Sequence, residues 1–376
     1  MIRSLSRRAL LAFPALAQQE LRFAGKRPMI VHSDFPEDLE SLPEYLSTWI
    51  TPNDVFFVRQ HLPRPTSDAA SHKIEIGGMV KQSASLSIAD LRKLPQVTVP
   101  AVLECAGNGR GYFRPKMPGL QWTKGAIGNA EWRGPRLAEV LAQAGGAMPS
   151  TAYADFNGLD IGVAKTPDFI RSIPLRKLLH PSTILAVDMN GAPLPDLHGG
   201  PVRLIVPGWD GACWVKWVAR IDLVDKMHTG FYMNPAYRYP KTPVAPGGAA
   251  RPEDLDVLEG MAVKSFFAKP ADQVKVPLGS TVTLTGPAWA GENKIARVDI
   301  STDAGSTWRP ATLSKQDFQF SWRIFTYDWK PAKAGYHTVC CRATDSAGRV
   351  QPIEASWNPS GYLWNSIDRL GILVEG

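Results

Sequence analysis

The feature that most constrains the fold of this chain is a change of sequence pattern near residue 240. Between residues 56 and about 239, short strand patterns alternate with short helix patterns. Residues 240–253 are then rich in proline and glycine, a composition typical of a connection between domains. Beyond residue 253 the strand patterns continue with no helix pattern between them. The sequence therefore predicts two domains of different structural class.

The first of these domains is predicted to mix α-helices and β-strands. Ser87 and Asp90 have the spacing of a capping box, in which two side chains bond free amides at the start of a helix. Pro135 is expected to open a stronger helix, because proline suits the first helical position. Asn190-Gly191 is typical of a two-residue hairpin turn between antiparallel strands.

The second domain is predicted to consist of strands alone. Residues 281–285, 297–301 and 320–324 alternate between apolar and polar side chains, as half-buried strands do. Residues 303–305 and 345–348 have the composition of turns. An immunoglobulin-like β-sandwich is the architecture that fits this pattern best.

Size and charge limit the classes of function. The chain has 376 residues, of which 44% are hydrophobic, and single cores stop growing near ~250 to 300 residues, so two domains are expected. No stretch reaches the ~18 consecutive apolar residues of a membrane span. The formal charge is +7, but the lysines and arginines are scattered rather than clustered, which argues against nucleic acid as the main partner.

The N-terminus has the features of an export signal. Arg7 and Arg8 form a twin-arginine pair, a short apolar stretch follows, and residues 15–17 form a small-x-small cleavage site. We expect residues 1–17 to be a twin-arginine signal peptide, with Gln18 as the mature N-terminus. This route carries folded proteins out of the cytoplasm, so a periplasmic location is expected.

The segment with the clearest chemistry is residues 104–110, Glu-Cys-Ala-Gly-Asn-Gly-Arg. A β-branched run before it predicts a strand that delivers Cys105 into a glycine-rich turn. Gly107 lets the backbone come close to a bulky ligand, and Arg110 favours the ionised sulfur that binds metal or attacks carbon. A buried structural cysteine beside a turn is the alternative interpretation.

These seven residues resemble the molybdenum-ligand segment of the sulfite oxidase family, in which the cysteine binds the metal of a molybdopterin cofactor. Four further stretches resemble that family in the same order, and five ordered matches are far more specific than one. They are residues 56–63, 119–127, 198–204 with 215–217, and 357–362. The resemblance covers about residues 25–376.

The resemblance implies an α+β fold, with a mixed α/β molybdopterin-binding domain followed by an immunoglobulin-like β-sandwich. In the family the second domain forms a homodimer, although the residues alone leave a packing module equally open. The expected boundaries are a signal peptide at 1–17, a catalytic domain at 18–240, a linker at 241–252 and the sandwich at 253–376.

The activity that the resemblance implies is molybdenum-dependent oxidation of sulfite to sulfate, as in a sulfite dehydrogenase. The cofactor would be molybdopterin carrying molybdenum, with Cys105 as its protein ligand. No Cys-x-x-Cys-His sequence occurs, so we expect no haem in this chain and an external electron acceptor such as a c-type cytochrome. Four cysteines are too few for a disulfide framework. The adjacent Cys340 and Cys341 are expected to pack on opposite faces of a strand.

The resemblance also implies which residues take part. A small dianion is bound best by the planar, paired donors of arginine, and Arg59 and Arg110 match the substrate pocket. Arg110 could instead hold the turn or serve the cofactor, and a shifted register would replace Tyr237 by Tyr232 or Tyr239. The catalytic set is Cys105, Arg59, Tyr237, His61, Arg110 and Trp122. The cofactor-binding set is Phe57, Val58, Arg59, Gln60, His61, Cys105, Asp160, His198, Arg203, Trp214, Val215 and Lys216.

Two departures from the family pattern leave the substrate open. Vertebrate and plant members have an arginine where this chain has Ser360, and an acid where it has Ala236. The anion pocket therefore has one cation fewer, or recruits one from elsewhere. Related enzymes with the same cofactor that oxidise sulfane sulfur or reduce methionine sulfoxide are alternatives.

Two rival interpretations belong to other classes. A cysteine hydrolase would use Cys105 as nucleophile with a histidine base, and it would be active without metal. An exported adhesive or scaffold protein would depend mainly on the β domain, but it leaves the ordered motifs unexplained.

Overall fold

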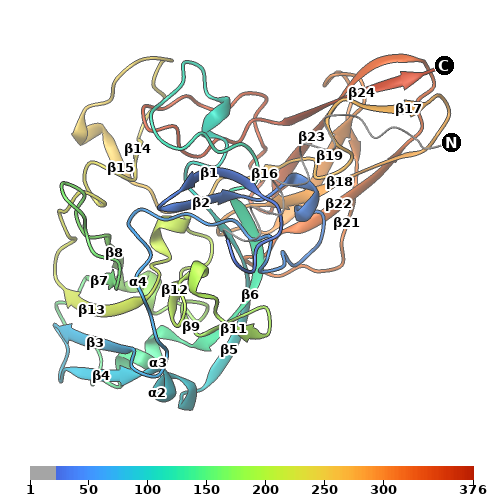
Figure 1. Cartoon of the computed structure of the whole chain (residues 1–376). Helices are drawn as coiled ribbons and strands as arrows, with labels where there is room; N and C mark the ends of the chain where they lie inside the picture. Colours follow the sequence, from blue (N-terminus) through green and yellow to red (C-terminus); the bar gives the residue numbers. More distant parts are fainter. Residues whose placement is uncertain (1–22) are drawn as a thin grey trace.

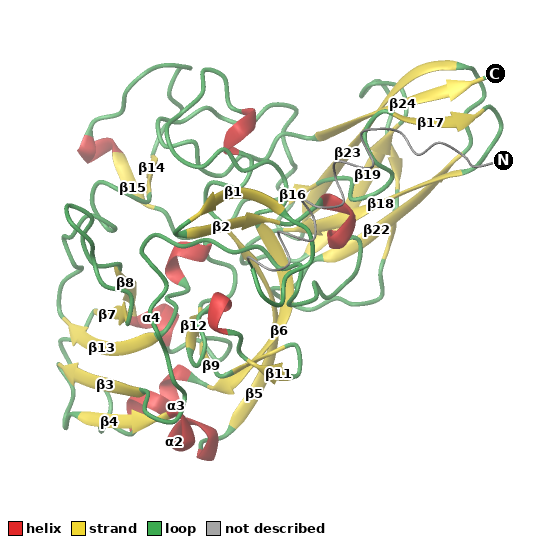
Figure 2. Cartoon of the chain, viewed as in Figure 1, coloured by secondary structure: helices red, strands yellow, loops and turns green. Residues whose placement is uncertain are grey.

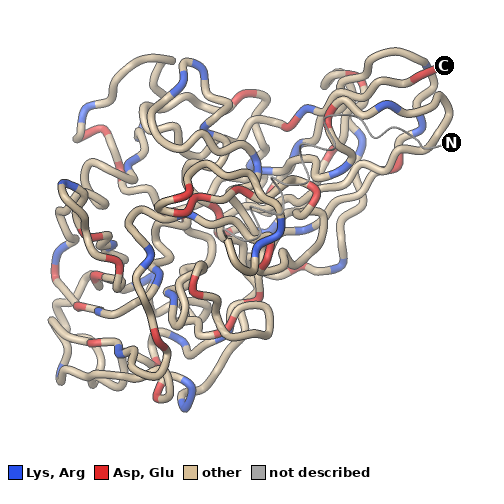
Figure 3. The backbone as a smooth tube through the Cα atoms, viewed as in Figure 1, with Lys and Arg blue, Asp and Glu red and all other residues tan. Residues whose placement is uncertain are grey.

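The computed structural model describes residues 23–376, so the signal peptide expected at residues 1–17 lies outside the described residues. Figure 1 shows two regions, a mixed region formed by the earlier part of the chain and a strand-only region toward the C-terminus. Within residues 23–376, no helix is long and apolar enough to cross a membrane. Figure 3 shows that the positions of lysine and arginine are interspersed with those of aspartate and glutamate along the described chain.

The mixed region is built on two sheets. One sheet has the strand order β11 (Ala192–Pro193), β10 (Asp188–Met189), β6 (Ile127–Pro135), β5 (Gln96–Glu104). The other has the order β4 (Ala84–Ser87), β3 (Lys73–Gly78), β13 (Val218–Val224), β7 (Tyr153–Gly158), β8 (Ile170–Pro174). Three two-stranded ribbons complete it: β1 (Ile30–Asp34) with β2 (Glu37–Glu40), β9 (Ile184–Ala186) with β12 (Arg203–Ile205), and β14 (Arg238–Pro240) with β15 (Leu255–Val257).

The helices are short and lie between strands, as Figure 2 shows. The α-helices are α2 (Ile88–Lys93), α3 (Leu137–Ala142) and α4 (Leu175–Leu178). The 3-10 helices are η1 (Pro43–Leu46), η2 (Arg110–Tyr112), η3 (Asp196–His198), η4 (Gly211–Cys213) and η5 (Pro252–Asp254). One large apolar cluster holds the mixed region together, with Phe56, Trp132, Leu141 and Phe156 among its buried members.

Two of the three local predictions for this region are confirmed. Ser87 and Asp90 form the capping box at the start of α2. Asn190 and Gly191 join β10 to β11 with φ angles of 54° and 77°, which a two-residue hairpin turn requires. The helix expected from Pro135 is present as α3, but Pro135 does not open it, because this residue ends β6 opposite Gln96 and the helix begins two residues later.

The C-terminal region is a β-sandwich. Its first sheet has the order β16 (Lys264–Ser265), β18 (Val282–Trp289), β22 (Arg323–Trp329), β21 (Thr312–Leu313). Its second sheet has the order β17 (Val274–Pro277), β24 (Asp368–Glu375), β23 (Gly335–Asp345), β19 (Ile295–Ser301), β20 (Arg309–Pro310). Buried apolar residues from both sheets form one cluster between them, which includes Leu284, Phe325, Val298 and Ile372.

The strand predictions for this region hold in two places out of three. Residues 281–285 and 297–301 lie largely in β18 and β19. Residues 320–324 reach β22 only at Arg323, because Phe320 bridges to Ala101 and Trp322 donates to the carbonyl of Trp49 in the mixed region. Cys340 and Cys341 are adjacent in β23, and both are buried free thiols.

The two regions share an interface, and a segment of the C-terminal region packs against the mixed region. Residues 241–252 lie in the connection that links the paired strands β14 and β15. A separate apolar cluster joins them, with Val102 and Ile127 on one side and Trp289 on the other. The segment after β23 returns to the mixed region, where the Leu363 amide donates to the carbonyl of Ala106 at 2.9 Å. The Cys105 turn is therefore built from both regions.

Candidate active site

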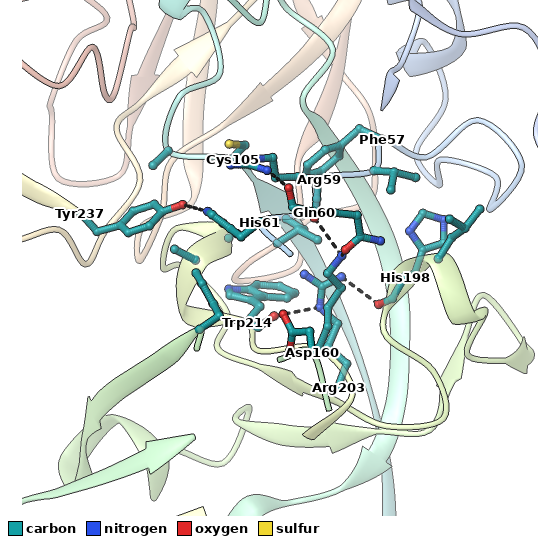
Figure 4. A pocket seen from close by; sticks show the side chains of 18 residues that line it. Phe57, Arg59, Gln60, His61, Cys105, Asp160, His198, Arg203, Trp214 and Tyr237 are labelled. Atoms are coloured by element: carbon teal, nitrogen blue, oxygen red, sulfur yellow. Dashed lines mark hydrogen bonds between the residues drawn. The ribbon is translucent and has the colours of Figure 1, made fainter. Parts of the chain in front are cut away.

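One pocket brings most of the predicted site residues together, and Figure 4 shows it. Its walls come from the segment between β2 and β3, the turn after β5, the segments around η3 and η4, and Tyr237 before β14. Figure 4 shows the Cys105 sulfur at one end of the pocket and Arg203 toward the other. The predicted residues that line it are Phe57, Val58, Arg59, Gln60, His61, Cys105, Asp160, His198, Arg203, Trp214, Lys216 and Tyr237.

The Cys105 turn begins where β5 ends. The Cys105 amide donates to the carbonyl of Ala126 at 2.9 Å, and the Asn108 amide donates back to the Cys105 carbonyl at 2.8 Å. Burial raises the pKa of the Cys105 thiol, and the charges of Arg59 and Arg110 only partly oppose that effect. The expectation that Arg110 would favour the thiolate is therefore outweighed by burial in the protein alone.

Arg59 lies beside a buried carboxylate. Its guanidinium forms an ion pair with Asp38 of β2 at 3.2 Å and donates to the carbonyl of Gln60. Asp38 also accepts the Gln60 amide at 3.0 Å, which fixes the backbone of this wall. Burial alone lowers the pKa of Arg59, but Asp38 and Tyr237 raise it above its usual range. Arg59 is therefore a permanent, oriented cation at the pocket.

Lys216 approaches the same wall from the other side. Its ammonium donates to the carbonyl of Arg59 at 2.8 Å and to the side-chain oxygen of Gln60. Burial lowers the pKa of Lys216 well below its usual range, and burial raises the pKa of the nearby Asp160. The side-chain nitrogen of Gln60 is buried and has no acceptor among the described residues. It is free to donate to a ligand.

Arg203 is a buried cation that forms no ion pair with a carboxylate among residues 23–376. It donates only to backbone carbonyls, of Trp214 at 3.2 Å and of His198 at 3.0 Å. Its exposed fraction is 6%, and burial lowers the pKa of Arg203 to about 9. Buried charges without counter-ions are costly, so such a site favours an anionic ligand.

His198 is held by a lysine that the sequence analysis did not single out. Its Nε2 lies 2.8 Å from the buried ammonium of Lys26, which also donates to the carbonyl of Phe56 at 2.8 Å. Burial and the charge of Lys26 hold the pKa of His198 well below its usual range. The neutral imidazole thus closes the pocket wall without adding another charge.

His61 and Tyr237 form the polar side of the pocket near Cys105. The Tyr237 hydroxyl and His61 Nε2 share a hydrogen bond, as Figure 4 shows. Burial, with repulsion from Arg59 and Lys216, holds the pKa of His61 well below its usual range. Burial, followed by the effect of Tyr362, raises the pKa of Tyr237 well above its usual range. The pair is therefore a neutral imidazole and a protonated phenol.

Aromatic and cationic neighbours hold this pair in place. The rings of His61 and Phe169 stack at 4.4 Å, and Tyr237 stacks on Tyr362 at 5.5 Å with an angle of 4° between the ring planes. The guanidinium of Arg171, which is 0% exposed, lies 5.0 Å from the centre of the Tyr237 ring. Arg171 thus places a positive charge behind the phenol.

Three predicted residues do not line the pocket. Val215 is buried in the apolar core beside it. Trp122 is also in that core, with its ring 4.5 Å from the ring of His32 and its indole nitrogen without an acceptor among the described residues. Arg110 lies behind the Cys105 turn, where it donates to the carbonyls of Ser360 at 3.2 Å and Leu120 at 3.3 Å.

Three glycines make room for the Arg110 side chain. A methyl group added at Gly107, Gly119 or Gly361 would lie 2.8 to 2.9 Å from atoms of Arg110, closer than side-chain carbons pack. Gly119 and Gly361 also have positive φ angles of 99° and 61°. This placement fits the alternative in which Arg110 holds the turn.

Sequence reasoning missed Lys26, Asp38 and Arg171. Each lies outside the stretches that resemble the family, and each contributes through contacts with residues distant in sequence. An isolated Lys, Asp or Arg is most often a surface residue, so sequence offered no signal for them.

Two family models match the chain. The oxidoreductase molybdopterin binding domain matches residues 61–232, and the Mo-co oxidoreductase dimerisation domain matches residues 256–375. These matches define a molybdopterin-dependent oxidoreductase.

Comparison with individual proteins defines the family. The chain is 35% identical over 362 residues to mitochondrial sulfite oxidase of Rattus norvegicus, covering 92% of this chain and 65% of the relative. It is 31% identical over 352 residues to sulfite oxidase of Arabidopsis thaliana, covering 86% and 88%. The chain belongs to the sulfite oxidase family of molybdopterin enzymes. It spans about two thirds of the length of the mitochondrial relatives that it matches.

A solved structure shares the fold along the whole chain. The sulfane dehydrogenase SoxCD from Paracoccus pantotrophus matches with a TM-score of 0.80 and 28% identity, covering 100% of this chain and 93% of that one. Two kinds of sulfur oxidoreductase are thus among the proteins that this chain resembles.

The pocket residues fit a molybdopterin cofactor. A phosphate group needs buried donors, which Arg203 and Lys216 offer. A pterin ring needs partners at its amide edges, and Asp160 and the unpaired side-chain nitrogen of Gln60 supply an acceptor and a donor. The thiol of Cys105 lies among the same lining residues and is a suitable ligand for a soft metal.

Proposed function

We propose that this protein oxidises sulfite to sulfate and passes the electrons singly to an external acceptor such as a c-type cytochrome. The observation that carries the proposal is the pocket in which the thiol of Cys105 lies with the guanidinium of Arg59 and the hydroxyl of Tyr237. Sulfite oxidases at 35% and 31% identity support the choice of substrate.

The protein side chains would bind and orient the reactants. Arg203, Lys216, Asp160 and Gln60 would hold the molybdopterin, and Cys105 would bind its metal. When bound, the cofactor supplies oxygen-atom transfer and takes up two electrons. Arg59 would bind the sulfite dianion, since its planar donors match the oxygens and its orientation is fixed beforehand by Asp38.

The pair of His61 and Tyr237 would manage protons at the pocket. The phenol of Tyr237 has one proton, which it would donate either to neutral His61 or to an oxygen of substrate or product, and exchange between these two acceptors would orient that oxygen. Burial keeps both groups in these protonation states over the neutral pH range. Arg171 behind the ring disfavours protonation of the neighbouring imidazole, since its charge lowers the pKa of His61.

A second candidate is oxidation of sulfane sulfur. Ser360 stands where vertebrate and plant members have a cationic residue, and in the structure its carbonyl accepts a bond from Arg110. A pocket with fewer cations binds a dianion less tightly, and it suits a substrate with less charge. The similarity to a sulfane dehydrogenase over the whole chain supports this candidate.

The cysteine hydrolase is disfavoured by the site. Such an enzyme needs a histidine bonded to the thiol, yet His61 is bonded to Tyr237 and no histidine among the described residues bonds the Cys105 sulfur. Burial also raises the pKa of the thiol, which lowers the fraction of reactive thiolate.

Location and assembly are part of the proposal. The twin-arginine pattern at residues 6–11 supports export to the periplasm. The match to a dimerisation domain at residues 256–375 supports a homodimer formed through the C-terminal sandwich, which would be of immunoglobulin-like type.

One experiment tests the proposal directly. The purified full-length chain should contain about one molybdenum per chain by elemental analysis. It should reduce ferricyanide when sulfite is added, and a small cytochrome c should be a better acceptor than dioxygen. A protein with molybdenum that oxidises a sulfane substrate but not sulfite would favour the second candidate. A mature protein without molybdenum would refute both.

A further inference from the structure

A buried polar network joins the Cys105 turn to the C-terminal sandwich. Glu104 directly precedes Cys105 at the end of β5, and Asn108 follows three residues later. The Glu104 carboxylate accepts bonds from the Asn108 side-chain amide at 3.0 Å, the Lys264 ammonium at 3.1 Å and the Trp289 indole at 2.8 Å. Lys264 also donates to the carbonyl of Asn108 at 3.1 Å.

The sandwich presents its two donors as one unit. Lys264 begins β16 and Trp289 ends β18, and these strands pair with Lys264 directly opposite Trp289. The Lys264 ammonium lies 5.6 Å from the centre of the Trp289 ring, which adds a cation–π contact. The position of both donors is therefore set by the ladder of the sandwich rather than by the Cys105 turn itself.

The network is fully enclosed. Exposed fractions are 6% for Glu104, 6% for Lys264, 1% for Asn108 and 1% for Trp289. A buried ion pair tolerates little movement, because separating the charges leaves each one unsolvated. Both flanks of Cys105 are thus fixed by contacts that the other structural region supplies.

The bonds reach the backbone that carries the thiol. Asn108 accepts the Ala126 amide at 3.2 Å through its side-chain oxygen, while the Cys105 amide donates to the Ala126 carbonyl at 2.9 Å. A shift of Glu104 or Asn108 would therefore move Cys105, which lies between them. Lys264 touches neither the pocket nor the thiol, so any effect on the site passes through these two residues.

We propose that Lys264 is a positioning residue for the metal-binding thiol. Through Glu104 and Asn108 it holds the turn in the geometry in which the sulfur of Cys105 faces the pocket. The inference rests on the proposed function only in taking Cys105 as the ligand of the molybdenum. The alternative is that the network only stabilises the interface between the two regions and has no effect on the geometry of the Cys105 turn.

The test compares two equivalent substitutions. Lys264→Met removes the network's ammonium, and Lys124→Met removes another ion pair between the regions, the 2.7 Å contact of Lys124 with Asp368. Residues that orient a metal ligand typically change metal affinity or activity roughly 10- to 100-fold when replaced. Lys264→Met should lower the molybdenum content per chain and shift the thiolate-to-metal absorption band. Lys124→Met should lower the melting temperature while keeping the content and the band of the wild type.

Two further variants distinguish a change in the geometry of the Cys105 turn from a simple loss of folding. Glu104→Gln combined with Lys264→Met leaves no buried charge, so the chain should fold, yet the absorption band should still shift. Lys264→Arg should restore part of the molybdenum content, because it keeps a donor and a charge.

The outcomes separate this inference from the proposed function. A wild-type content and band in both Lys264→Met and the double variant would overturn the positioning role while leaving the proposed function intact. Wild-type protein without molybdenum would overturn the proposed function instead. Equal spectral changes in Lys124→Met and Lys264→Met would support the alternative and overturn the inference.

Discussion

The wall of the pocket and the interior of the C-terminal sandwich hold opposite kinds of side chain. The sandwich interior is apolar, with Leu284, Phe325 and Val298 between its sheets. The pocket wall holds Arg203 and Lys216, neither of which pairs with a carboxylate among residues 23–376. Burying a leucine gains roughly 1.5 to 3 kcal/mol, whereas burying a charge costs several. The pocket is thus arranged for an anionic ligand at the expense of stability.

The largest effect is expected for Cys105→Ser, which should change activity at the pocket without changing the stability of the fold. The variant should lose sulfite oxidation down to the background rate, because a hydroxyl is a poor ligand for a soft metal. Its fold should persist, since the change is nearly isosteric. Steady-state assays and circular dichroism check both parts, and retained turnover would contradict the role of Cys105 as metal ligand.

Leu284→Ala in the sandwich interior should have the opposite effect, lowering stability while leaving activity unchanged. Leu284 is 0% exposed, so the variant should lose about 2 to 5 kcal/mol of unfolding free energy through the cavity it leaves. The kcat/KM per bound molybdenum should stay at the wild-type value. Chemical denaturation and kinetics on the same preparation measure both, and a large fall in kcat/KM at full folding would break the comparison.

Arg59→Ala tests the substrate end of the pocket. Losing a charge-assisted contact costs about 1.5 to 3 kcal/mol, so kcat/KM for sulfite should fall roughly 10- to 150-fold, with a raised KM. Arg64→Ala is the matched control, because Arg64 forms ion pairs with Asp196 and Glu37 with its side chain 39% exposed. If both variants show wild-type kinetics, Arg59 does not bind the substrate.

The smallest expected effect is a pH dependence from Lys26. Burial lowers its pKa to about 7 in the folded protein, although Asp54 raises it, so the unfolded chain binds more protons between about pH 7 and 10. The free energy of unfolding should therefore rise with pH in this window, by at most about 1.4 kcal/mol per pH unit from this group.

The control for Lys26 is a difference between variants. Lys26→Met should remove this part of the slope, while Lys93→Met, with a side chain that is 75% exposed, should leave it unchanged. Denaturation curves at pH 7, 8 and 9 for the three proteins provide the comparison. Parallel slopes for the wild type and Lys26→Met would exclude the buried ammonium as their cause.

Local patterns predicted the elements whose neighbours are close in sequence. The capping box at Ser87 and the turn at Asn190 depend on contacts within a few residues, and both formed as expected. The strand expected at residues 320–324 forms only from Arg323 onward, because the Trp322 indole donates to the carbonyl of Trp49 across the interface. Tertiary contacts of this kind leave no periodic trace in the sequence.

The same limit applies to the pocket. The run from Phe57 to His61 lines it as a unit, since one motif carries all five residues. Arg110 and Trp122 lie within matched motifs, but they do not line the pocket. Lys26 and Arg171 belong to no motif, and only folding brings their charges to His198 and Tyr237.

The three glycines around Arg110 have a consequence for how this protein can change. Gly107, Gly119 and Gly361 belong to separate stretches of the chain, yet each one leaves room for the same guanidinium group or its stem. A larger residue at any one of them would require the arginine to move, and a moved arginine would release the carbonyls of Leu120 and Ser360. Gly119 and Gly361 also have positive φ angles, so homologues that lose the arginine should relax the requirement for glycine chiefly at Gly107, whose nearest atoms all belong to Arg110.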